Sequence, residues 1–136
     1  MKARRLGYAR VSTKDQTLER QIKLLNESNV NTENIYLEKV SGRTLNRTKW
    51  KELLADLIMG DTLVVTELDR LGRTKKDIIA TFELLKAKGV YVEILNMPFL
   101  NTNTENEIMR EVLQPSVLNV LSYFAEKDLE IKKERQ

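Results

Sequence analysis

Strand-like and helix-like stretches alternate along the first hundred residues, and this alternation is the feature that most constrains the fold. The strand-like segments, short and apolar or alternating, are 5–11, 34–40, 62–68 and 90–94. The helix-like segments, with apolar residues three or four apart, are 14–28, 48–59 and 75–88. Such alternation predicts an α/β fold with a mainly parallel sheet of four to five strands and helices on both faces.

The pattern changes in the last third of the chain. Residues 97–104 are predicted to form a loop, and 105–136 have a long helical pattern interrupted by Pro115. The apolar residues of this helix cover about 180°, whereas a helix on the surface of one domain needs only about 100°. We therefore predict an α/β body over 1–104, followed by a dimerisation helix that contacts a second chain. A deeply buried core helix is the alternative. Beyond Glu126 the sequence is almost wholly charged, and we expect the helix to continue into a further, DNA-binding domain that the chain does not contain.

The composition excludes several kinds of chemistry. The chain has no cysteine and no histidine, so disulfides, thiolate catalysis, zinc sites of the usual kind and histidine acid–base catalysis are excluded. No apolar run reaches the length of about 18 residues that a membrane span needs, and a cytoplasmic setting is expected. The net charge of +3 does not by itself indicate nucleic acid, so the positions of the positive residues matter more.

The first polar motif, Tyr-Ala-Arg-Val-Ser-Thr-Lys-Asp-Gln at 8–16, runs from the end of a predicted strand into the start of a predicted helix. Ligands of open α/β sheets gather outside the carboxyl ends of strands, and helix N-termini favour anions. Ser12 is therefore placed where a phosphate would bind, with Arg10 close by. The alternative is that Ser12 only caps the helix. Thr13 and Gln16 already form a capping box, which leaves Ser12 outside it.

The second polar motif follows the strand at 62–68 and contains Asp69, Arg70 and Arg73. The two arginines are three residues apart, so one helical turn directs both toward the same object. Arginine presents a planar, permanently charged fork that matches phosphate oxygens. The polar loop 41–47 adds further arginines, although each of them alone would be read as a solvated surface charge.

These two motifs, together with the loop 41–47, resemble the signatures of the serine recombinases, the resolvase/invertase group. The nucleophile motif of that family is similar to 8–16, and its second signature, Gly-Asp-x-x-Val-x-x-x-Leu-Asp-Arg-Leu-Gly-Arg, is similar to 60–73. The resemblance covers residues 5–73 closely. Over the remainder it is looser.

The resemblance implies that Ser12 attacks a DNA phosphodiester and forms a 5′-phosphoserine link, and that Arg10, Arg70 and Arg73 bind the scissile phosphate. It implies that Arg47, Gln21 and Asp69 support these residues, and that the surroundings contain Glu38, Ser41, Asp61 and Arg43. The group that takes the proton of Ser12 is left open between Asp69 and an arginine-bound network. The resemblance also implies no metal and no cofactor, with double-stranded DNA and identical subunits as partners, first in a dimer and then in a synaptic tetramer.

One position departs from the family pattern. An arginine is usual where this chain has Leu129, whereas Arg135 fits a second arginine position in the same helix. Lys127 or Lys132 are candidates to replace the missing DNA contact. This departure leaves open a catalytically silent member that assembles or regulates other recombinase subunits. A flavodoxin-like nucleotide-binding domain is a further alternative, but the chain lacks the glycine-rich phosphate loops of that class.

Overall fold

The computed structural model describes residues 3–12, 18–40, 47–72, 74–103, 111, 114–116 and 118–120. Several expectations fall on residues outside this set: the side chain of Ser12, the capping box of Thr13 and Gln16, Ser41, Arg43, Arg73, Lys127, Leu129, Lys132 and Arg135. The predicted C-terminal helix also lies mostly outside it, with short helical runs described at 114–116 and 118–120.

The four described strands form one parallel sheet. They are β1 (Arg5–Ser12), β2 (Ile35–Val40), β3 (Thr62–Val65) and β4 (Tyr91–Ile94), in the order β2-β1-β3-β4. In register, Ser12 lies beside Val40 and Gly7 beside both Ile35 and Val64. The predicted parallel α/β sheet is confirmed.

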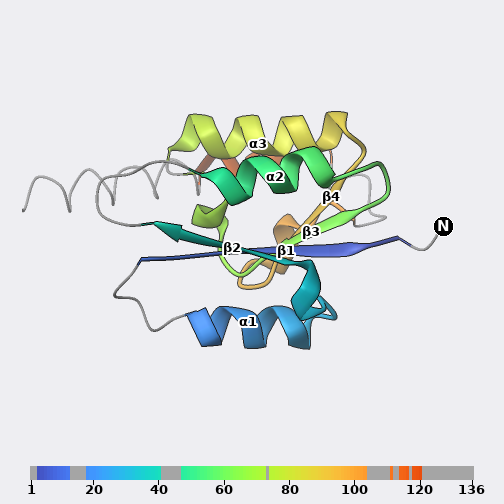
Figure 1. The fold of residues 1–136 in the computed structure, drawn as a ribbon. Coiled ribbons are helices and arrows are strands. Elements are labelled where there is room, and N and C mark those ends of the chain that lie inside the picture. The colour runs from blue at the N-terminus through green and yellow to red at the C-terminus, as the bar shows by residue number, and fades with distance from the viewer. Residues whose placement is uncertain are drawn as a thin grey trace, which may run out of the picture.

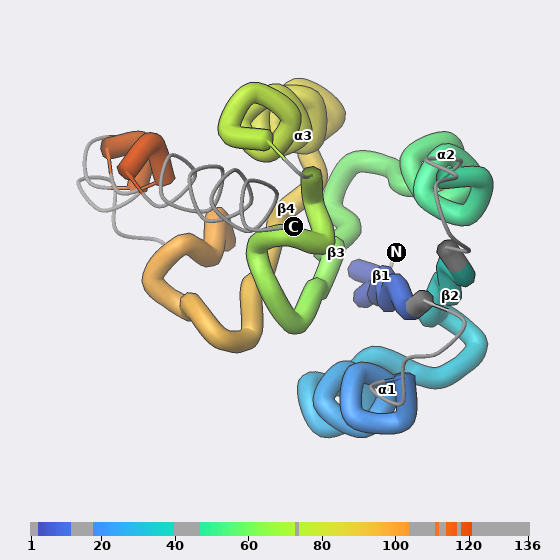
Figure 2. Tube along the Cα trace, turned by 90° about the vertical axis from the view of Figure 1, so that its left-hand side faces the viewer, coloured from blue at the N-terminus to red at the C-terminus, as the bar shows by residue number. Residues whose placement is uncertain are grey.

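The helices cover the two faces of the sheet unequally. Figure 1 shows α1 (Leu18–Glu27) on one face and both α2 (Thr48–Asp56) and α3 (Lys75–Ala87) on the other, and Figure 2 shows the same division in a second view. Alternation along β1 separates two cores. Leu6 and Tyr8 join the larger core with α2 and α3. Ala9 joins a core of four buried residues under α1: Ala9, Leu25, Val30 and Val64.

Close packing of α1 on the sheet depends on Gly7. A Cβ at this position would lie 3.2 Å from side-chain atoms of both Leu25 and Val30. The absence of a side chain therefore lets α1 and the turn after it approach β1.

Two predicted elements are shorter than expected. The helix predicted over 48–59 ends at Asp56, because the Ile58 N–H donates to the Asp61 carboxylate (2.8 Å) and Arg4 donates to the Asp56 carbonyl (2.9 Å). The strand predicted over 62–68 ends at Val65, and the chain then forms a 3₁₀ turn, η2 (Leu68–Arg70). Two further 3₁₀ turns are η1 (Thr32–Asn34) and η3 (Pro98–Leu100).

The strand order reverses between β1 and β3, since β2 lies on one side of β1 while β3 and β4 lie on the other. Such a switch point opens a crevice outside the carboxyl ends of the two central strands, where ligands of α/β sheets bind. Among the residues that the structure describes, no helix has the length and apolar character needed to cross a membrane.

Candidate functional site

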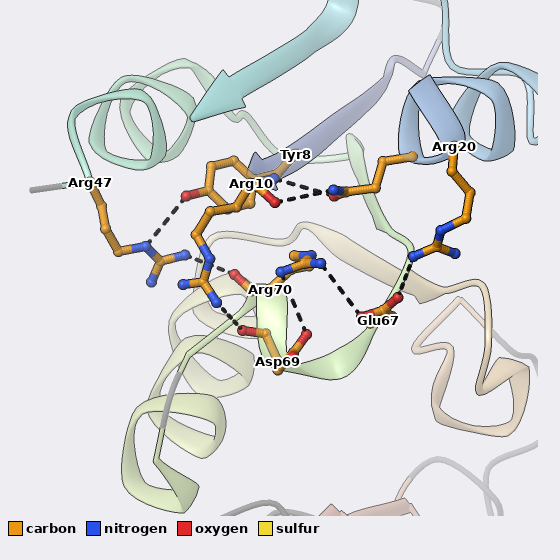
Figure 3. A network of polar contacts seen from close by, with 8 residues as sticks. Tyr8, Arg10, Arg20, Arg47, Glu67, Asp69 and Arg70 are labelled. Atoms are coloured by element: carbon orange, nitrogen blue, oxygen red, sulfur yellow. Dashed lines mark hydrogen bonds and ion pairs between the residues drawn. The ribbon is translucent and has the colours of Figure 1, made fainter. Parts of the chain in front are cut away.

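Two segments far apart in sequence meet at the switch point. Arg10 lies near the carboxyl end of β1, and η2 follows the carboxyl end of β3. The Arg10 Nη2 donates to the main-chain carbonyl of Asp69 at 3.2 Å. Figure 3 shows the side chain of Arg10 reaching from β1 toward η2, beside Arg70. The structure therefore brings together Arg10, Asp69 and Arg70, as the two motifs predicted.

Gln21, on α1, fixes the main chain of β1 at this edge. Its side chain is fully buried, its Oε1 accepts from the Arg10 N–H (3.3 Å) and its Nε2 donates to the Arg10 carbonyl (3.1 Å). An amide that bonds both main-chain groups of one residue acts as a strand neighbour would. Gln21 thus sets the point at which Arg10 leaves the sheet.

Arg47 approaches the same place from the start of α2. Its Nη2 donates to the Arg70 carbonyl at 2.8 Å and its Nε to the Tyr8 hydroxyl at 3.4 Å. Its Cζ lies 4.5 Å from the ring centroid of Trp50 and 5.3 Å from that of Tyr8. A guanidinium over aromatic faces is attracted by the ring quadrupoles. Two rings and two hydrogen bonds therefore hold Arg47 against η2.

The side chain of Arg70 is largely enclosed at this edge. Its side chain is 13% exposed, and its closest charged partners are Glu67 (3.6 Å) and Asp69 (4.0 Å). Its Nε is buried and has no hydrogen-bond partner among the described residues. A guanidinium carries five N–H donors, and leaving a buried donor unbonded costs about 1–3 kcal/mol. Arg70 is therefore placed to gain from an added acceptor.

Glu38, a buried residue of β2, caps α2 from outside the helix. Its carboxylate accepts from the main-chain N–H groups of Lys49 (3.2 Å) and Trp50 (3.1 Å), while the N-cap residue provides no capping side chain. The Tyr8 hydroxyl donates to the same carboxylate at 3.3 Å. Burial raises the pKa of that hydroxyl, an effect that Arg47 partly opposes, so Tyr8 remains a donor. Glu38 thus lies behind Arg47, linked to it through Tyr8.

Asp61 does not reach the site, and its placement there by resemblance is corrected. It precedes β3 at the amino edge of the sheet and accepts from Arg4 through Nε (3.1 Å) and Nη2 (2.6 Å). Burial alone would raise the pKa of this carboxyl, but hydrogen bonds from Arg4 and the Ile58 N–H offset burial and lower the pKa. Asp61 and Asp69 flank the same strand, so they lie at opposite edges.

Sequence reasoning missed three residues of the network in Figure 3. Tyr8 alternates with Arg10 along β1, which is the signal that both point to one face. Glu67 comes directly before η2 and Arg20 directly before Gln21, yet neither position was singled out. Glu67 accepts from the Arg20 Nη2 at 2.8 Å.

Within the described part of the chain, no group of three or more acidic residues is placed to hold a metal ion.

The fold and the site define an α/β domain with several arginines gathered at its switch point. The family model described as "Resolvase, N terminal domain" matches residues 5–136, and the chain belongs to this family. The resemblance inferred from the two motifs is confirmed.

Relatives agree with this assignment. A resolvase from Clostridium perfringens is 40% identical over 101 residues, which are 74% of this chain and 53% of that protein. The Tn21 resolvase from Escherichia coli is 32% identical over the whole chain and 68% of its own length. The DNA-invertase hin of Salmonella typhimurium is 39% identical over 66% of this chain and 46% of its own. This chain spans about half the length of the Clostridium relatives.

A crystal structure of a resolvase family site-specific recombinase from Streptococcus pneumoniae has the same fold. It matches with a TM-score of 0.58 at 18% identity, over 98% of this chain and 95% of that one. At this identity the match supports the fold.

Proposed function

We propose that this chain is the catalytic domain of a serine recombinase that cuts and rejoins DNA at specific sites. The Ser12 hydroxyl oxygen attacks a DNA phosphorus, and the bond from phosphorus to the 3′-oxygen breaks. The 3′-hydroxyl leaves with a proton, and a phosphoserine joins Ser12 to the 5′ end. Attack by a 3′-hydroxyl on this link, after strand exchange, reverses the step. The bond energy is kept, so no nucleotide is required, and we expect the arginines to neutralise the phosphoryl oxygens in place of a metal ion.

The observation that carries the proposal is the gathering of Arg10, Arg47 and Arg70 around η2, with the Nε of Arg70 lacking a partner in the described structure. Ser12 is the last residue of β1, two positions beyond Arg10 at the same edge. Negative charge grows on the phosphoryl oxygens during transfer, and prepositioned guanidinium groups stabilise it. Arg73 completes the set in this proposal.

The partners belong to the same proposal. We expect double-stranded DNA, a homodimer and a tetramer that holds two DNA sites, with the segment 105–136 as the dimerisation helix. Arg135, Lys127 and Lys132 are the proposed DNA contacts of that segment. The relatives' names, resolvase and DNA-invertase, support a recombination reaction. Phosphate contacts make the affinity for DNA fall steeply with salt.

The test uses the full-length protein and a supercoiled plasmid with two recombination sites. We expect Ser12→Ala to abolish cleavage while DNA binding persists, and a nicked site to trap the unaltered protein as a covalent adduct that yields phosphoserine on hydrolysis. Arg70→Ala should slow cleavage by about 10²–10³-fold, as the loss of one oxyanion donor does. Lys86→Ala, an exposed substitution at the far end of α3, is the matched control.

Two outcomes would overturn the proposal. Normal cleavage by Ser12→Ala would show that the Ser12 hydroxyl is not the nucleophile. DNA binding by the unaltered protein with no covalent adduct on the nicked site would instead assign the chain to a silent, assembly-only class.

A further inference from the structure

We propose that Glu67 is a positioning residue for Arg70, held in turn by Arg20. The inference rests on the proposed function, because it assigns Arg70 to the scissile phosphate. Glu67 takes no part in the mechanism described above and is not among the residues that the family resemblance implied.

Each oxygen of the Glu67 carboxylate faces a different arginine. Oε1 accepts from the Arg20 Nη2 at 2.8 Å, and Oε2 lies 3.6 Å from the Arg70 Nη2. Figure 3 shows Glu67 between Arg20, which comes from α1, and Arg70, which comes from the 3₁₀ turn η2. Glu67 is therefore the link by which α1 reaches the guanidinium of Arg70.

The exposed fraction of the side chain falls from Arg20 through Glu67 to Arg70. Arg20 is 51% exposed, Glu67 30% and Arg70 13%. The outer pair, Arg20 with Glu67, is close but solvated, whereas the inner contact is longer and lies where water is largely excluded. A charge contact is stronger where water is excluded. The direction in which Arg70 points therefore depends on Glu67 more than the 3.6 Å separation alone would indicate.

Within the described part of the chain, the other charge contact of the Arg70 guanidinium is long. The Asp69 carboxylate is 4.0 Å away and half exposed, and the Nε lacks a partner within the described structure. Arg47 bonds the main-chain carbonyl of Arg70. Without Glu67, the end of this side chain would be free to turn toward Asp69 and away from an incoming phosphate.

Arg20 offsets the negative charge that Glu67 brings to an anion site. A lone carboxylate beside Arg70 would repel a DNA phosphate, but its ion pair with Arg20 neutralises most of that charge. The ion pair of Arg20 and Glu67 thus orients Arg70 while its own net charge stays near zero. Arg20 acts through Glu67 and makes no contact of its own with the reacting phosphate.

The test compares single-turnover cleavage rate constants at saturating DNA with DNA affinities measured in the Ser12→Ala background. We expect Glu67→Gln to slow cleavage about ten-fold or more, since misplacement of a catalytic group by 1 Å costs on the order of 10²-fold. Its affinity should be unchanged or tighter by about two- to five-fold, the range for a part-exposed charge pair. Arg20→Gln should slow cleavage and also weaken binding.

The double variant Arg20→Gln/Glu67→Gln separates this role from direct DNA contact by Arg20. If Arg20 acts only through Glu67, the double variant cleaves no more slowly than Glu67→Gln alone. Additive losses in cleavage rate would overturn the proposal. An unchanged rate constant for Glu67→Gln would also overturn it, as would parallel losses of rate, affinity and melting temperature, which indicate a merely structural residue.

Controls distinguish failure of this inference from failure of the proposed function. Glu33→Gln removes the same charge in η1, at the amino edge of the sheet, and is expected to leave both readouts unchanged. Arg70→Ala tests the site itself. If Arg70→Ala is slow and Glu67→Gln is normal, only the positioning role fails. If Arg70→Ala also cleaves normally, the proposed function fails.

Discussion

Replacing Glu38 with glutamine perturbs a single carboxylate that ties β2 to the start of α2 and, through Tyr8, to Arg47. The two oxygens of Glu38 each accept a different main-chain N–H, Oε2 from Lys49 and Oε1 from Trp50. Glutamine has one oxygen and an NH₂ group, so in either orientation one buried helix N–H faces a donor in place of an acceptor. The variant keeps the shape of the side chain and changes its hydrogen bonding and its charge.

The expected loss follows from these contacts. One hydrogen bond to a charged acceptor contributes about 1.5–3 kcal/mol, and a carboxylate at a helix N-terminus about 0.3–1 kcal/mol. The free energy of unfolding should therefore fall by about 2–4 kcal/mol. For a chain of 136 residues this corresponds to a midpoint lower by roughly 6–20 °C.

Urea and thermal unfolding of Glu38→Gln measure this loss. Glu52→Gln is the matched control, because Glu52 lies on the exposed face of the same helix and forms a solvated pair with the Lys49 side chain at 3.3 Å. Its removal should change the free energy of unfolding by no more than about 0.5 kcal/mol. A loss below about 1 kcal/mol for Glu38→Gln, or one equal to the control, would refute the capping role.

Four further outcomes are expected. Gly72→Ala places a Cβ 2.7 Å from a side-chain atom in the first turn of α3 and should lower the free energy of unfolding by about 1–3 kcal/mol, measured by urea denaturation. Leu25→Ala empties a fully buried site and should cost about 2–5 kcal/mol by the same measurement. Arg47→Lys keeps the charge but loses the ring stacking and the paired hydrogen bonds, so plasmid cleavage should slow by about 10²-fold with little change in melting temperature. The hydrogen bonds and charge of Arg5 lower the pKa of Glu93 in the folded protein. This carboxylate therefore stabilises the fold above its unfolded pKa, and the stability is lost as pH falls through the lower folded pKa. A Glu93→Gln variant should show a flatter acid-unfolding curve.

The alternation of strand and helix patterns was enough to predict the parallel sheet and its three helices, because burial on both faces leaves a strong signal in Val64 and its neighbours. The ends of elements were less predictable. The stop signal at Gly60 and Asp61 is local, but the end of α2 at Asp56 also depends on Arg4, which is 52 residues away in sequence.

The site was predictable where one motif carries its own geometry, as with Arg10 at the end of β1. It was not predictable where a contact joins a strand to a helix, as with Glu38 of β2 and the main-chain N–H groups at the start of α2. Asp61 shows the opposite error, since it shares a sequence motif with Asp69 yet precedes the strand that Asp69 follows. Counting the strand residues between Asp61 and Asp69, at about 3.3 Å per residue, would have placed the two carboxylates at opposite ends of β3.

The small core beneath α1 has a consequence for the order in which the fold opens. Among the described residues, four buried side chains form that core, whereas α2 and α3 share a much larger one. Helices with few buried apolar contacts open at lower free energy than the rest of a domain. Amide hydrogens of α1 should therefore exchange with solvent before those of α3, and each such opening withdraws Gln21 from Arg10. Opening of α1 would therefore loosen the edge of the sheet where Arg10 meets η2.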